Sequence, residues 1–61
     1  MPTELGIRKE QKALLFLLKK LEKDNEDIKV KGLREAIIAQ ETVMDQRDIP
    51  LVEKQIARLY S

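Results

Sequence analysis

The chain has 61 residues, of which 43% are hydrophobic and 38% charged, and its net charge is +1. It contains neither cysteine nor histidine, which excludes disulfide bonds and zinc sites built from these ligands. A chain this short buries only about 60% of the surface that its unfolded form exposes, so proteins of this size often need a second copy or a partner to complete their core.

The composition is rich in Leu, Ile, Lys and Glu and poor in Pro and Gly, which favours helices. The first predicted helix begins near Thr3, a residue type that caps helices, and ends at about Lys23. At about 100° per residue, an apolar stripe follows one side of this helix. We expect the stripe to face the core; its members are Ile7, Ala13, Leu14, Leu17, Leu18 and Leu21.

Two large apolar residues of this helix, Leu15 and Phe16, lie outside that stripe. Phe16 falls nearly opposite to it, in a patch of lysines. The lysines around Phe16 are Lys9, Lys12, Lys19, Lys20 and Lys23. Residues 1–23 hold six basic and three acidic side chains, whereas residues 24–61 hold six and eight, so the first helix is the basic part of the chain.

The sequence KDNED, residues 23–27, predicts a break because Asp and Asn favour turns and caps over helix interiors. A second helix is expected from about Asp27 or Lys31 to Asp45, with Gly32 as an alternative boundary. The residues predicted to share its core face are Leu33, Ala36, Ile37, Gln40, Val43 and Met44.

The sequence DQRDIP, residues 45–50, predicts a second break. Pro50 cannot occupy a helix interior without the loss of a hydrogen bond, and it pushes the backbone of Ile49 out of the helical region. We expect Asp48 to cap a third helix that has Pro50 in its first turn and ends at about Tyr60. The apolar side of this helix comprises Val52, Ile56, Leu59 and Tyr60.

These elements predict an all-α fold in a single small helical domain, residues 1–61. Three helices of decreasing length, joined by short connections, would pack as a three-helix bundle with antiparallel neighbours. If the chain stays helical through Pro50, the alternative is a helical hairpin that dimerises, because one hairpin encloses almost no core. The predicted core residues are Leu14, Leu17, Leu18, Leu21, Leu33, Ile37, Val43, Met44, Val52, Ile56 and Leu59.

The side chains that catalysis and metal binding require are missing or scattered. There is no His or Cys, and the four hydroxyl side chains lie apart with no sign of an activating partner. A calcium-binding loop from Asp27 with Gly32 at its glycine position would place Lys29 and Lys31 where oxygen ligands belong. We therefore expect no enzyme, no cofactor and no metal site.

The apolar residues outside the core stripes predict an interface with another chain. Ile38 in the second helix lies among carboxylates, whereas Phe16 lies among lysines, so the two faces have opposite charge. This pattern predicts a small protein–protein interaction module, a regulator, adaptor or inhibitor that forms a homodimer or binds a larger protein. The candidate interaction residues are Leu15, Phe16, Lys12, Lys19, Lys20, Lys23, Ile38, Glu41 and Asp45.

Two other functions stay open for the first helix. Its Lys-rich face could bind the phosphates of RNA or DNA, with Phe16 stacked on a base, and its mixture of Leu and Lys also suits a helix on a membrane surface. The chain begins with Met and holds no apolar stretch long enough for a signal peptide or a membrane-spanning helix. We therefore expect a complete cytoplasmic protein without a transmembrane segment.

Overall fold

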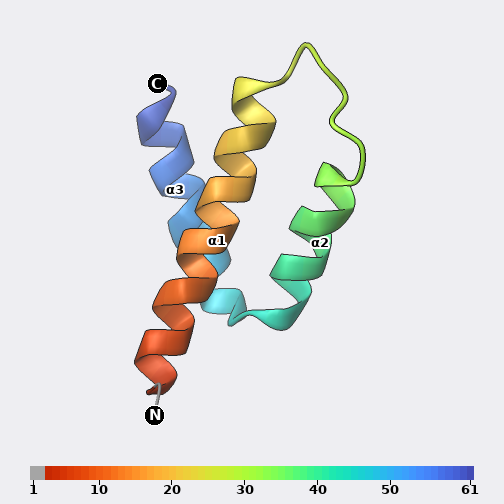
Figure 1. Cartoon of the computed structure of the whole chain (residues 1–61). Coiled ribbons are helices and arrows are strands. Elements are labelled where there is room, and N and C mark those ends of the chain that lie inside the picture. The colour runs from red at the N-terminus through yellow and green to blue at the C-terminus, as the bar shows by residue number, and fades with distance from the viewer. Residues whose placement is uncertain (1–2) are drawn as a thin grey trace.

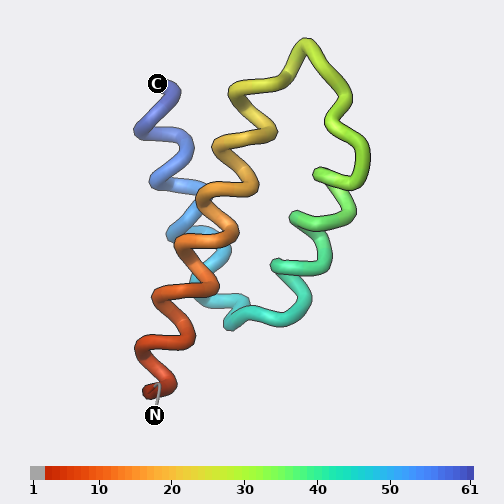
Figure 2. The backbone as a smooth tube through the Cα atoms, viewed as in Figure 1, coloured from red at the N-terminus to blue at the C-terminus, as the bar shows by residue number. Residues whose placement is uncertain are grey.

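The computed structural model describes residues 3–61 and folds them into helices without strands. Helix α1 spans Glu4–Asp24, α2 spans Leu33–Val43 and α3 spans Ile49–Leu59, with the short 3-10 helix η1 (Gln46–Asp48) directly before α3. Figure 1 shows α2 antiparallel to α1, and α3 returning beside α1 in the same direction as α1. The backbone trace in Figure 2 follows the same path, and α1 contacts both other helices. The predicted all-α three-helix bundle is confirmed.

The helix boundaries follow local signals in the sequence. Thr3 caps α1, because its Oγ1 accepts a hydrogen bond from the backbone N–H of Gly6 at 3.1 Å. Helix α2 begins directly after Gly32, whose φ of 80° is a left-handed conformation that glycine adopts without strain. The alternative boundary at Gly32 is thereby confirmed. Helices α2 and α3 each have 11 residues, so the expected decrease in length stops at α2.

The chain breaks before Pro50 as predicted, but the details of the break differ. Ile49 has helical backbone angles, φ −61° and ψ −50°, so the prediction that Pro50 excludes this conformation is wrong. Because η1 leads directly into α3, Ile49 continues an existing turn, and Pro50 stands in the first turn of α3, where the missing N–H breaks no helical hydrogen bond. Asp48 does not cap α3 with its side chain; its carboxylate binds Arg8 of α1.

The core lies where α2 and α3 meet one side of α1. Leu15 of α1, Ile37 of α2 and Val52 of α3 are fully buried and belong to one apolar cluster. The cluster also contains Leu33, Met44 and Ile56, and its partly buried neighbours are Phe16, Leu18 and Ile49. The core prediction is thus confirmed at Leu33, Ile37, Met44, Val52 and Ile56.

The core prediction is wrong at five positions, which are exposed: Leu14, Leu17, Leu21, Val43 and Leu59. Leu15, which was predicted to lie outside the core, is its central residue on α1. The buried side of α1 also includes long charged side chains: Arg8 reaches Asp48 at 2.9 Å, and Lys19 reaches Glu41 at 3.3 Å. Their aliphatic stems cover the core while their charged ends meet the neighbouring elements, so this side of α1 needs no continuous apolar stripe.

Candidate interaction surfaces

The apolar stripe of α1 faces away from the core. Ile7, Leu14, Leu17 and Leu21, together called the α1 stripe, are 43 to 60% exposed. At about 100° per residue they lie within roughly 80° of one another, on the side of α1 away from Leu15. Ile7, Leu14 and Leu21 follow one another at intervals of seven residues. Leu17 lies three residues after Leu14, which is the spacing between the a and d positions in the seam of a coiled coil. The spacing is that of a helix face that packs on another helix.

The whole molecule exposes more surface than its mass predicts. A folded monomer of this mass should expose roughly 4,100 Å², whereas this chain exposes 4861 Å². The excess, roughly 750 Å², is close to the roughly 800 Å² that one partner contributes to a standard protein–protein interface. Part of it lies on the connection between α1 and α2, where residues 28–32 are all exposed. The rest is consistent with helix faces that lack a covering partner.

A groove runs between α1 and α3, and we call it the basic groove. Its apolar residues are Ala13, Phe16 and Leu17 of α1 with Leu51 and Leu59 of α3. Its polar residues are Lys9, Lys12, Lys54, Gln55 and Arg58. The volume of the groove, about 1140 Å³, exceeds the range of roughly 300–1,000 Å³ that is typical of small-molecule sites. Its size and composition therefore suit a segment of polypeptide better than a small ligand.

The two apolar residues that the sequence singled out on α1 have different environments. Phe16 is half-buried, packs against the core and lines the basic groove. Leu15 is fully buried, so it offers no surface to a partner in this fold. Phe16 therefore remains the candidate anchor residue, whereas Leu15 belongs to the core.

Three of the predicted basic site residues are engaged within the chain. Lys19 lies 3.3 Å from Glu41 and 3.6 Å from Glu53, and so joins α1 to both other helices. Lys20 binds Asp24 at 2.8 Å, and Lys23 lies 3.3 Å from Glu26. Lys12 differs from these three, since it lines the basic groove and forms no ion pair among residues 3–61.

The predicted acidic face of α2 is likewise occupied by contacts inside the chain. Ile38 is 52% exposed, as its position outside the core face implies. Glu41 contacts Lys19, and Asp45 contacts Arg47 and Arg8. The structure therefore brings Lys19 and Glu41 together within one chain, where the sequence suggested a contact between two chains.

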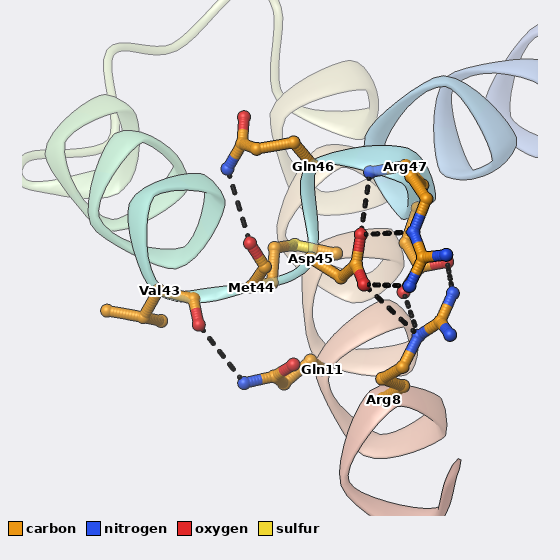
Figure 3. Close-up of polar contacts among 8 residues, drawn as sticks. Arg8, Gln11, Val43, Met44, Asp45, Gln46 and Arg47 are labelled. Carbon is orange, nitrogen blue, oxygen red and sulfur yellow. Dashed lines mark hydrogen bonds and ion pairs between the residues drawn. The ribbon is translucent and has the colours of Figure 1, made fainter. Parts of the chain in front are cut away.

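A network of charged side chains joins the α2–α3 connection to α1, as Figure 3 shows. Arg8 donates to the Asp48 carboxylate from Nε at 3.1 Å and from Nη2 at 2.9 Å, and its Nε lies 3.7 Å from Asp45. Arg47 donates to Asp45 from its backbone N at 2.9 Å, from Nε at 3.0 Å and from Nη2 at 2.6 Å. No local pattern signals this network, because Arg8 and Asp48 are 40 residues apart and an Asp before a helix is typical of a cap.

The network fixes the charge of its carboxylates. The hydrogen bonds from Arg8 hold the pKa of Asp48 below its ordinary value, although burial acts in the opposite direction. The pKa of Asp45 is lowered chiefly by the hydrogen bonds that it accepts from the side chain and backbone of Arg47. Both carboxylates are therefore ionised at neutral pH and are directed at arginines of their own chain. This arrangement holds the connection between α2 and α3 against α1.

Comparison of the chain with protein-family models, with curated proteins and with solved structures returned no match. Within residues 3–61, no helix has the length and apolar character that crossing a membrane requires. The argument for function therefore rests on the surfaces described above.

Proposed function

We propose that this protein is a small protein–protein interaction module that self-associates as a homodimer through the α1 stripe. The observation that carries the proposal is the row of four large apolar side chains at coiled-coil spacing on the solvent side of α1. An exposed apolar surface of this kind marks a site of association in soluble proteins. Such a module would act as a regulator, adaptor or inhibitor through the surfaces that it presents.

The charges beside the stripe favour an antiparallel pair of α1 helices. In a parallel pair each residue meets its equivalent, so Glu10 would face a second Glu10 and Asp24 a second Asp24. In an antiparallel pair centred between Leu14 and Leu17, Glu10 of one copy lies opposite Leu21 of the other, so the like charges are separated. The two-fold axis uses the same patch on both copies.

The hydroxyl groups of the chain support a non-enzymatic role. The Thr42 hydroxyl donates to the backbone of Ile38, the Ser61 hydroxyl to the backbone of Arg58, and the Tyr60 hydroxyl to the carboxylate of Asp24. The Thr3 hydroxyl caps α1. Each of these groups has a local structural partner, and none has the adjacent base that activates a nucleophile.

The self-association is tested by the mass in solution of wild type and two variants. We expect wild type to show twice the 7.1 kDa mass of one chain at high concentration, and Leu14→Glu to stay monomeric because it places a carboxylate in the middle of the stripe. Ile38→Glu, an equally exposed apolar position on α2, is the matched control and should still dimerise. A monomeric wild type, or dimerisation lost in Ile38→Glu and kept in Leu14→Glu, would contradict the proposal.

A second candidate function is nucleic-acid binding by the Lys-rich face of α1. Lys9 and Lys12, which line the basic groove, support it. Lys19, Lys20 and Lys23 count against it, because each already forms an ion pair with a carboxylate of the chain. Binding to RNA or DNA that weakens steeply with salt would favour this candidate.

A further inference from the structure

The basic groove is where the chain concentrates its unmatched positive charge. Among residues 3–61, six of the twelve basic side chains form ion pairs, namely Arg8, Lys19, Lys20, Lys23, Arg34 and Arg47. Four of the other six line this groove: Lys9, Lys12, Lys54 and Arg58. No carboxylate of residues 3–61 lines it. We infer that the basic groove binds an acidic amphipathic helix of a partner protein.

The apolar floor has the dimensions of a helix-binding site. Figure 1 shows that α1 and α3, which contact each other, run in the same direction. The residues that line the groove come from both of these helices. Leu51 and Leu59 of α3 are eight residues apart, which is about 12 Å along the axis of α3. A partner helix covers this distance in about two turns and presents apolar residues at i, i+4 and i+7 to such a floor. Phe16 of α1 supplies the aromatic surface on which these residues pack.

The walls of the groove decide the charge of the occupant. Lys9 and Lys12 stand on the α1 side, and Lys54 and Arg58 stand on the α3 side. A helix with Glu or Asp on both flanks of its apolar stripe would meet cations on both walls. Such complementarity steers association and excludes helices with basic flanks, which would face like charge. The partner class is therefore an acidic amphipathic helix, which would pack on α1 and α3 as a fourth helix beside α1, α2 and α3.

A second copy of this chain does not supply such a helix. The most acidic helix face of the chain surrounds Ile38, but Glu41 there contacts Lys19, and the nearby Asp45 contacts Arg47 and Arg8. Glu41 and Asp45 are thus committed to their own chain, and the third carboxylate near Ile38, Glu35, cannot by itself place negative charge on both flanks of an apolar stripe. The inference is thus distinct from the proposed self-association: the α1 stripe adjoins the groove and shares only Leu17 with it, whereas Ile7, Leu14 and Leu21 lie outside the groove.

Two synthetic helical peptides test the inference. Both carry Leu at i, i+4, i+7 and i+11; one has Glu at the flanking positions, and the other has Lys in their place. Titration of each labelled peptide with the full chain, followed by fluorescence anisotropy, should show binding of the acidic peptide only. The double variant Lys54→Glu/Arg58→Glu should weaken this binding by about tenfold or more, since each reversal turns an attraction into a repulsion.

The matched control is the double variant Lys29→Glu/Lys31→Glu, which makes the same change of charge outside the groove. It should keep the wild-type affinity for the acidic peptide. The inference is overturned if the acidic peptide does not bind, if the two peptides bind equally, or if both double variants lose affinity equally. Tighter binding of an oligonucleotide or of phosphatidylserine vesicles than of the acidic peptide also overturns it.

The same titration with Leu14→Glu separates this inference from the proposed function. Leu14 does not line the basic groove. Retained affinity in this variant supports a groove that works in each chain alone, whether or not wild type dimerises. Loss of affinity there contradicts the inference as stated.

Discussion

Asp48 is the one charged side chain that is buried among residues 3–61, and its burial depends on Arg8. A carboxylate removed from water is unfavourable unless hydrogen bonds and an opposite charge compensate. The two hydrogen bonds from the guanidinium of Arg8 provide both, and they connect the first part of α1 to the turn before α3. This pair therefore attaches the start of α3 to α1, beside the apolar core that the two helices share.

The pairing predicts how stability depends on pH. The pKa of Asp48 is lower in the folded chain than in the unfolded chain, where it is about 3.9. Its contribution to the free energy of unfolding is therefore present at neutral pH and is lost as the pH falls below about 4. We expect Asp48→Asn to lower the melting temperature at pH 7 and to reduce the loss of stability between about pH 5 and pH 2.

Asp27→Asn is the control for this prediction, because Asp27 is exposed and its side chain forms no hydrogen bond or ion pair among the described residues. It should reproduce the melting temperature of wild type at pH 7. Thermal melts followed by circular dichroism over the acid range provide the measurement. If the melting temperature depends on pH in the same way in wild type and in Asp48→Asn, the Arg8–Asp48 pair contributes nothing to stability.

At the scale of the elements, the existence and ends of the helices follow from the sequence, but the orientation of α1 does not. Thr3, Gly32 and Pro50 act on their own neighbours in the chain, so their effect is visible locally. The six apolar residues from Ala13 to Leu18 give α1 more than one apolar side. The longer of its apolar stripes, which includes Leu14, Leu17 and Leu21, is the natural candidate for the side that faces the core. The structure buries the side with Leu15 instead, because charged side chains from distant positions complete it.

The candidate surfaces were predictable to a similar extent. Phe16 stood out on α1 because an aromatic ring among lysines does not suit a solvent-facing side, and it does line a groove. The other wall of that groove, with Leu51, Lys54 and Arg58, depends on α3 lying parallel to α1. No local pattern reports such a pairing. For the same reason the sequence does not predict that the α1 stripe is exposed, because periodicity identifies an apolar stripe but does not show what covers it.

Replacement by alanine should have opposite effects on stability at the two glycines, Gly32 and Gly6. Gly32 has φ 80°, and a β-carbon in that conformation costs roughly 1–2 kcal/mol even though the surrounding space is open. Gly6 lies in α1, where an added β-carbon would meet Thr3 Oγ1 at an ordinary 3.4 Å. Alanine is more favourable than glycine inside a helix by roughly 0.5–1 kcal/mol.

We therefore expect Gly32→Ala to lower the free energy of unfolding and Gly6→Ala to raise it, as measured by urea denaturation of both variants beside wild type. Each variant serves as the control for the other, because the chemical change is the same. A shift in the same direction for both would mean that the conformation of Gly32 does not limit the start of α2.

At the scale of the whole molecule, the fold divides its apolar residues between two tasks. Six of them form one buried cluster, while large side chains on all three helices stay exposed. The radius of gyration, 12.1 Å, exceeds the roughly 10.5 Å expected for a compact chain of this length. A core of this size stabilises a small domain only marginally. Covering the α1 stripe with a second copy would add buried apolar surface without any change in the fold.

This argument predicts that thermal stability depends on protein concentration. If folding and dimerisation are coupled, each tenfold rise in protein concentration raises the apparent free energy of unfolding by about 1.4 kcal per mole of dimer. The melting temperature of wild type should therefore rise steadily across a dilution series, whereas that of Leu14→Glu should stay constant and lie below it. A wild-type melting temperature that does not change with concentration would mean that the α1 stripe adds nothing to stability through a second copy. The partner that covers the stripe would then have to be a different protein.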